Sequence, residues 1–387
     1  MFNRIQKLTL SLEESCFFWG PRQTGKSTLL KSLFPKSRIY DLLLSSQYER
    51  LIRHPGIIRE ECMAANLTGE TQQYPIIIDE IQKIPNLLDE VHWLIENRGL
   101  KFILCGSSAR KLIRSHANLL GGRAIRYELF PLTWREISDF SLEKALNSGL
   151  LPRHYKSSKP VRLIQSYIGD YLKEEILAES LTRNIPAFNR FLEIAAISNG
   201  EVLNYSNIAS ECAISSPTVK EYFQILEDTL IGYQIPAFRK KSKRRLIRSP
   251  KFYFFDLSPV IYLSRWGTIQ IGSPLFGRAF EHFILMELKA HASYSELFYP
   301  ISYWRTTSGH KVDFILGDHE IVIEIKSSTL IQPKYHLKNI RKFMLDYPTK
   351  RNIIVSNNPE PRMTEDKIEI LPWQMFLEEL WDGRIFD

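Results

Sequence analysis

The chain has 387 residues, 44% of them hydrophobic and 24% charged, and this composition excludes a disordered or fibrous protein. Its formal net charge of +8 is compatible with an anionic partner. The four cysteines form no C-x-x-C pair, which argues against a zinc ribbon or a disulfide framework. The sequence shows no signal peptide and no uninterrupted run of about 18 apolar residues, so we expect a cytoplasmic protein with no membrane partner.

The first third of the chain alternates apolar runs with helical patterns. The runs at 16–19, 38–42, 76–78 and 102–105 have the length and composition of buried strands. Strands that alternate with helices predict a parallel sheet covered by helices on both faces. We therefore expect an α/β domain over residues 1–140.

The first predicted strand leads into an octet that fits G-x-x-x-x-G-K-[ST], the P-loop pattern, and a helical run follows. Its glycines allow the backbone to aim N–H groups at phosphate oxygens, while Lys26 reaches the β- and γ-phosphates and Ser27 ligates magnesium. We expect this loop to bind ATP together with Mg²⁺. The predicted nucleotide-binding residues are Gly20, Pro21, Arg22, Gln23, Thr24, Gly25, Lys26, Ser27 and Thr28.

Two carboxylates end the strand at 76–78. Beside a P-loop, Asp79 would position magnesium and Glu80 would orient or deprotonate the attacking water. The strand at 102–105 leads to Ser107, our preferred contact to the γ-phosphate or the water, with Ser108 as the alternative. Arg123, after two glycines, is a candidate for stabilising the transferred phosphoryl group, from the same subunit or a neighbouring one.

The middle of the chain differs from the first third in composition and in predicted secondary structure. Residues 141–160 are rich in Ser, Lys and Pro, which predicts a linker, and residues 161–270 are mainly helical. The segment 206–226 predicts two helices joined by a turn at 213–215, with the apolar spacing of a helix-turn-helix. We expect Ser216, Thr218 and Lys220 at the exposed start of the second helix, where such helices meet DNA.

A basic cluster follows at 239–251, with eight positive charges in thirteen residues. Strand-like runs flank it, so it fits the wing of a winged helix, or alternatively a solvated loop. A wing of this charge would track DNA phosphates without reading sequence. The predicted DNA-binding residues are Lys240, Lys241, Lys243, Arg244, Arg245 and Arg248.

The C-terminal third predicts a second α/β module over residues 271–387. Strand residues two apart share a face, so Glu324 and Lys326 point together, and Asp313 on a neighbouring strand can join them. With Glu281 on the preceding helix, these acids would form an oxygen site for a second Mg²⁺ or for Mn²⁺, with Lys326 orienting a water. The set resembles the centre of PD-(D/E)xK nucleases, whose fold also serves as an inert DNA-binding platform.

The motifs W-G-P-R-Q-T-G-K-S-T, I-I-I-D-E-I-Q-K-I-P, C-G-S-S-A-R-K-L and L-G-G-R-A-I-R-Y-E-L-F-P-L-T-W-R-E-I resemble the prokaryotic AAA-like ATPase family that carries a C-terminal domain of unknown function. The resemblance spans essentially the whole chain. It implies an ASCE-type ATPase core, a winged-helix-like middle and an end similar to restriction endonucleases, and it favours Arg123 as a catalytic residue.

Taken together, the sequence predicts an ATP-hydrolysing, homo-oligomeric protein that acts on duplex or branched DNA as a motor or remodeller. An ATP-regulated nuclease is one alternative. A regulatory switch similar to the STAND ATPases, with the winged helix contacting protein, is another.

Overall fold

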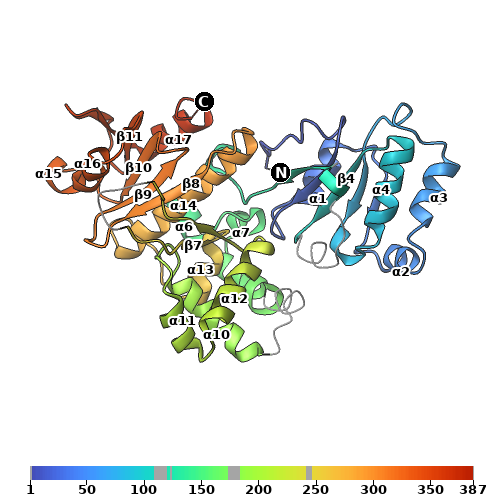
Figure 1. Cartoon of the computed structure of the whole chain (residues 1–387), viewed down its shortest axis with the longest axis horizontal. Coiled ribbons are helices and arrows are strands. Elements are labelled where there is room, and N and C mark those ends of the chain that lie inside the picture. Colours follow the sequence, from blue (N-terminus) through green and yellow to red (C-terminus); the bar gives the residue numbers. More distant parts are fainter. Residues whose placement is uncertain (1, 109–119, 123, 173–183, 241–245, 387) are drawn as a thin grey trace. The chain divides into compact units, whose positions relative to one another are not determined.

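The computed structural model describes residues 2–108, 120–122, 124–172, 184–240 and 246–386 (Figure 1). It divides into two compact units. Unit 1 comprises Met1–Pro131 with Asp228–Ile231, and unit 2 comprises Leu132–Glu227 with Gly232–Asp387.

Unit 1 is built on a parallel sheet with the order β2-β3-β4-β1-β5. Its strands are β1 (Ser15–Trp19), β2 (Ile39–Asp41), β3 (Ile76–Asp79), β4 (Phe102–Gly106) and β5 (Ala124–Glu128). Its helices are α1 (Lys26–Leu33), α2 (Ser45–Arg53), α3 (Ile57–Ala64) and α4 (Leu87–Arg98), with short turns at η1 (Ile81–Lys83) and η2 (Leu120–Gly122). The parallel sheet with flanking helices confirms the predicted P-loop fold class.

Side chains that point alternately to the two faces of these strands form the core of unit 1. Ile76 and Ile78 of β3 and Leu104 of β4 belong to one apolar cluster, together with residues of α3 and α4. The intervening residue Ile77 is also fully buried but points to the other face, since successive strand side chains alternate. A strand buried on both faces is what a helix-covered parallel sheet requires.

Residues 141–160, predicted to be a linker, are folded in unit 2. They form α6 (Leu142–Ser148) and α7 (Pro152–Lys156), followed by α8 (Pro160–Ser166) and the π-helical turn η4 (Tyr167–Leu172). Leu146 of α6 and Tyr155 of α7 are buried, so these short helices contribute to a core although their composition is polar.

A winged helix follows, formed by α10 (Ile185–Ile197), α11 (Tyr205–Cys212), α12 (Ser216–Asp228) and the antiparallel hairpin of β6 (Gly232–Ile235) and β7 (Lys251–Phe254). The predicted turn at 213–215 is confirmed. Ala213 ends α11 with a left-handed φ of 55°, and the Ser215 hydroxyl accepts the Thr218 N–H at the start of α12. Val219, Phe223 and Leu226 are buried, as their spacing predicted.

The rest of unit 2 is a mixed sheet with the order β12-β13-β11-β10-β9-β8. Its strands are β8 (Ile301–Arg305), β9 (Lys311–Leu316), β10 (Ile321–Lys326), β11 (Arg351–Ser356), β12 (Arg362–Met363) and β13 (Ile368–Pro372). Its helices are α13 (Leu257–Leu263), α14 (Pro274–Tyr294), α15 (Pro333–His336), α16 (Lys338–Met344) and α17 (Trp373–Trp381). Strand β9 is antiparallel to both of its neighbours, β8 and β10, whereas β10, β11 and β13 are mutually parallel and β12 is antiparallel to β13.

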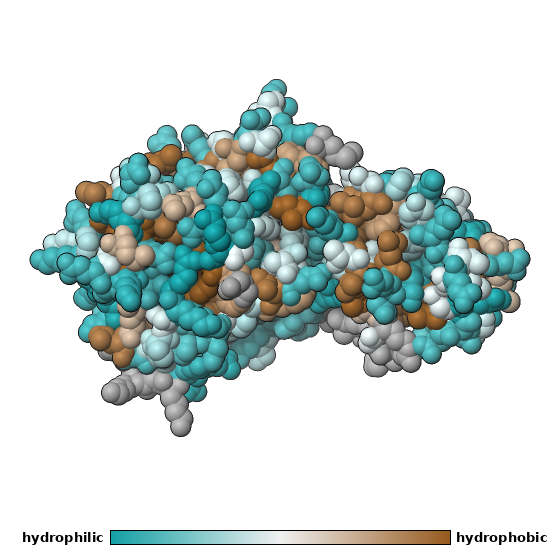
Figure 2. Space-filling model, turned by 90° about the horizontal axis from the view of Figure 1, so that it is seen from above, coloured by the Kyte–Doolittle hydropathy of each residue, from teal (hydrophilic) through white to brown (hydrophobic). Residues whose placement is uncertain are grey.

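On one face of the molecule, the apolar area is scattered rather than continuous. On the face drawn in Figure 2, hydrophobic side chains lie in small groups between hydrophilic ones. Within the described ranges, we find no helix with the length and apolar character needed to cross a membrane.

Candidate nucleotide site

The P-loop joins β1 to α1 at the carboxyl end of the sheet. A Cβ at Gly20 would lie 2.5 Å from the carbonyl oxygen of Leu129, so only glycine fits beside the chain that follows β5. Gly25 has φ of 97°, a left-handed conformation that glycine adopts without strain, and it begins α1. These two glycines therefore fix the path of the loop into the helix N-terminus, where N–H groups favour phosphate.

Lys26, Ser27 and Asp79 converge at this edge. The Lys26 ammonium is buried and donates to the carbonyl oxygens of Gly20 and Pro21, at 2.7 and 3.1 Å. The Ser27 hydroxyl donates to Asp79 Oδ2 at 2.6 Å. A hydroxyl and a carboxylate held together are the oxygen ligands that magnesium prefers beside a triphosphate. These residues fit the binding of ATP with Mg²⁺ that the sequence predicted.

Glu80 follows Asp79 with a left-handed φ of 61° and is largely buried. Burial raises the pKa of its carboxyl above the ordinary value, although Lys26 and Arg22 act in the opposite direction. A buried carboxylate with a raised pKa is a stronger base than an exposed one. This property suits the predicted role of Glu80, which is to orient or deprotonate the attacking water.

Strand β4 lies between β1 and β3, so its carboxyl end faces the same site. Ser107 is buried there, and its hydroxyl oxygen accepts a hydrogen bond from Gln82 at 3.1 Å. Ser108 is also buried. Arg123, the predicted transition-state arginine, lies outside the described residues.

Gln82 and Arg4 contact the site although the sequence did not single them out. The Gln82 amide donates to Glu80 Oε2 at 2.5 Å as well as to Ser107. A Cβ at Gly106 would lie 2.3 Å from Gln82 Oε1, so the glycine that ends β4 leaves room for this side chain. The only available signal was its position two residues after Glu80.

Arg4 ties the P-loop to the end of β5. Its guanidinium donates to the Thr24 carbonyl oxygen at 2.6 Å and to the Phe130 carbonyl oxygen at 2.6 Å. These contacts join residues 20 and 126 positions apart, and nothing in the local sequence pattern predicts them.

Replacing Gln82 by Ala should lower kcat for ATP hydrolysis by about tenfold with little change in KM, since a hydrogen bond to a charged group contributes about 1.5–3 kcal/mol. Gln82 lowers the pKa of Glu80, so its loss should move the acidic limb of the kcat profile to higher pH. A Gln73→Ala chain, altered at an exposed position, serves as control. If kcat falls but the acidic limb does not move, Gln82 acts through packing and not through the pKa of Glu80.

The predicted DNA-binding cluster lies in the connection between β6 and β7, as expected for a wing. Lys240 forms an ion pair with Asp318, and Arg248 is exposed. The connection is anchored on β8, where the N–H groups of Phe238 and Ile247 donate to the carbonyl oxygens of Tyr303 and Arg305. Lys241, Lys243, Arg244 and Arg245 lie outside the described residues.

The predicted nuclease-like metal site is not supported. Among the residues that the structure describes, no three His, Cys, Asp or Glu side chains are grouped so that they could hold a metal ion. The acids are instead paired with lysines, which the strand pattern did not reveal. The pairs are Glu324 with Lys326 at 2.5 Å, Asp313 with Lys311 at 3.4 Å and Glu281 with Lys251 at 2.8 Å.

The matches to known families divide the chain into three. Residues 13–138 match the model of an AAA domain, residues 139–270 match a domain of unknown function (DUF8612), and residues 276–376 match a domain of unknown function (DUF4143). Each model covers less than half of the chain.

The relatives are distant but extend over most of the chain. An uncharacterized protein of Mycobacterium tuberculosis is 24% identical over 92% of this chain and 80% of its own length. An uncharacterized protein of Methanocaldococcus jannaschii is 22% identical over 96% of this chain and 90% of its own. The Aeropyrum pernix ORC1 protein, solved in complex with DNA, is 12% identical over 67% of this chain and 89% of that chain, with a TM-score of 0.23, too low to carry an argument. The AAA-domain match and the P-loop geometry indicate a P-loop ATPase domain in the N-terminal part of the chain, and the matches that follow it are to domains of unknown function.

Proposed function

We propose that the chain hydrolyses ATP with magnesium and uses the turnover to change how its winged helix and C-terminal domain hold DNA. One observation carries the ATPase proposal. Ser27 and Asp79 form a hydrogen-bonded pair beside Lys26, and Glu80 is held next to them by Gln82. Groups for nucleotide, metal and water thus lie at the ends of neighbouring strands β1, β3 and β4.

In this proposal Asp79 and Ser27 would hold the magnesium ion, which would supply positive charge to neutralise the phosphates. Lys26 contacts the β- and γ-phosphates, and Glu80 takes the proton of the attacking water. Ser107 orients the water or the γ-phosphate. Arg123, from the same copy or from a neighbouring copy in a homo-oligomer, is proposed to stabilise charge on the transferred group.

The winged helix and the basic connection between β6 and β7 support DNA as the partner. The start of α12 exposes Lys220, and Arg239 and Arg248 are exposed on the connection. Cations on a wing attract DNA phosphates regardless of sequence. DNA cleavage is not part of the proposal, because the acids that would hold its metal ion are paired with lysines.

ATPase rates without DNA and with duplex, single-stranded and forked or four-way DNA test the proposal. We expect the preferred DNA to raise kcat by about fivefold or more, since coupling between two sites is typically worth 1–3 kcal/mol. Equal rates under all conditions, with turnover intact, would contradict the DNA role and favour a switch that binds protein.

A further inference from the structure

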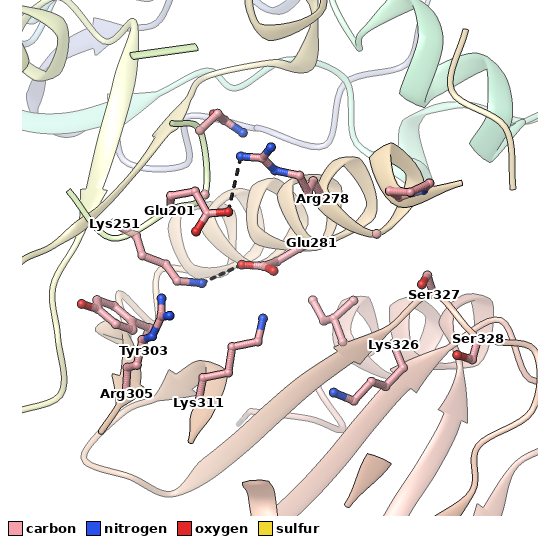
Figure 3. A pocket seen from close by; sticks show the side chains of 15 residues that line it. Glu201, Lys251, Arg278, Glu281, Tyr303, Arg305, Lys311, Lys326, Ser327 and Ser328 are labelled. Atoms are coloured by element: carbon pink, nitrogen blue, oxygen red, sulfur yellow. Dashed lines mark hydrogen bonds and ion pairs between the residues drawn. The ribbon is translucent and has the colours of Figure 1, made fainter. Parts of the chain in front are cut away.

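A pocket of about 270 Å³ lies in unit 2 beneath the first turns of α14 (Figure 3). Strands β7, β8, β9 and β10 and the loop at 199–201 complete its wall. The pocket is rich in positive charge. Its cationic lining residues are Lys251, Arg278, Arg305, Lys311 and Lys326.

The acidic groups at this pocket are already paired. Glu201 and Glu281 also line it, and they form ion pairs with Arg278 and Lys251. Figure 3 shows both pairs as dashed lines, with the ammonium groups of Lys311 and Lys326 directed into the space below α14. Arg305 makes no ion pair with any residue in the described ranges.

Two further carboxylates are ion-paired with Lys311 and Lys326 and are not among the residues that line the pocket. Asp313 and Glu324 are almost completely buried, whereas the side chains of Lys311 and Lys326 are 46% and 19% exposed. The two lysines therefore line the pocket, whereas the acids that pair with them, Asp313 and Glu324, do not. A divalent cation in the pocket would meet these ammonium groups before it reached Asp313 or Glu324, and like charges disfavour its binding.

Two hydroxyl groups and a glycine of α14 also line the pocket. Ser327 and Ser328 line it after β10, and a Cβ at Gly277 would lie 3.6 Å from the Ser327 hydroxyl oxygen. Ammonium, guanidinium and hydroxyl donors around one cavity match the acceptor oxygens of a phosphate group. Charge-assisted hydrogen bonds of this kind are stronger than neutral ones.

We propose that this pocket binds a phosphate group through Arg305, Lys311 and Lys326 without a divalent metal ion. The phosphate can belong to a nucleic acid strand or be free in solution. For the nucleic acid source, the inference rests on the proposed function, and it makes the C-terminal domain a second phosphate contact rather than a cutting centre.

Lysine labelling of the whole chain in EDTA tests this proposal. An amine-reactive reagent followed by peptide mass spectrometry reports each lysine separately, so phosphate at the P-loop does not confuse the result. We expect labelling of Lys311 and Lys326 to fall as inorganic phosphate is titrated, while the exposed Lys338, outside the pocket, keeps its labelling. A 5′-phosphorylated oligonucleotide should protect the same two lysines.

Arg305→Gln should raise the phosphate concentration for half protection by about tenfold, the loss expected for one charge-assisted hydrogen bond. Arg153→Gln removes the same charge at an exposed position outside the pocket and should leave protection unchanged. Absence of protection, or protection that needs Mg²⁺ or Mn²⁺, overturns the proposal. Protection by free phosphate but not by the oligonucleotide assigns the pocket to free phosphate.

The outcome is separable from that of the proposed function. DNA-stimulated ATPase activity with unprotected lysines would leave the proposed function standing and remove the phosphate pocket. Protection by phosphate in a chain whose ATPase rate does not change with DNA would support the phosphate pocket and contradict the proposed role of DNA.

Discussion

A chain carrying Glu80→Gln should bind ATP with magnesium yet hydrolyse it at least about 100-fold more slowly than the unchanged chain, because a positioned base typically contributes 10²- to 10⁴-fold. The amide has nearly the shape of the carboxylate but cannot take a proton. Lys26→Ala should instead abolish nucleotide binding or turnover, since the ammonium that it removes is buried at the mouth of the P-loop. Phosphate release and fluorescent-nucleotide binding separate the two outcomes.

Glu60→Gln is a matched control for this experiment. It makes the same chemical change at an exposed position on α3 and should leave both binding and turnover unchanged. If the Glu80→Gln chain hydrolyses ATP at the unchanged rate, Glu80 is not the base. If the Lys26→Ala chain also does so, the P-loop assignment itself fails.

The strands of unit 1 could be predicted closely because their apolar runs are bounded by polar or glycine residues. The run predicted at 102–105 is β4 at Phe102–Gly106, and that predicted at 76–78 is β3 at Ile76–Asp79. The motif residues lie at strand ends, and parallel strands bring their carboxyl ends to one edge. Local pattern was therefore enough to bring Ser27, Asp79 and Glu80 into one site.

The supporting contacts could not be predicted in this way. Arg4 reaches the Phe130 carbonyl oxygen across 126 positions, and Gln82 reaches Ser107 across 25. Such pairs depend on strand order, which periodicity does not encode. The same limit applies to 141–160, where a polar composition hid the buried faces of α6 and α7.

In the C-terminal set, the predicted geometry of β10 is right, whereas the predicted metal-binding chemistry is not supported. Alternation correctly placed Glu324 and Lys326 on one face of β10, but the two side chains lie 2.5 Å apart as an ion pair. Burial raises the pKa of Glu324, although Lys326 acts to lower it, and Lys311 helps to hold the pKa of Asp313 below its ordinary value despite burial. The sequence pattern indicates that these residues lie close together. Which acid is neutralised by which lysine depends on their burial.

Neutralising Arg244, Arg245 and Arg248 together to Gln should weaken duplex DNA binding by on the order of 100-fold at about 0.1 M salt, similarly for every sequence. Each phosphate contact adds about 0.9 to the slope of log affinity against log salt, so losing three should flatten that slope by about 2.7. Fluorescence anisotropy over a salt series measures both quantities. Arg248 is exposed, whereas Lys240 is paired with Asp318 and is a poorer choice for the test.

A second triple variant separates local contacts from net charge. Lys334, Lys338 and Lys367 are exposed in the C-terminal domain, and changing them to Gln removes the same total charge away from the wing. If both triples weaken binding equally, DNA responds to the overall charge of the protein and the wing has no special part. A flattened slope in the wing variant alone would place three phosphates at the connection between β6 and β7. Because α12 precedes that hairpin directly, its exposed Lys220 would then be the next residue to test for base contact.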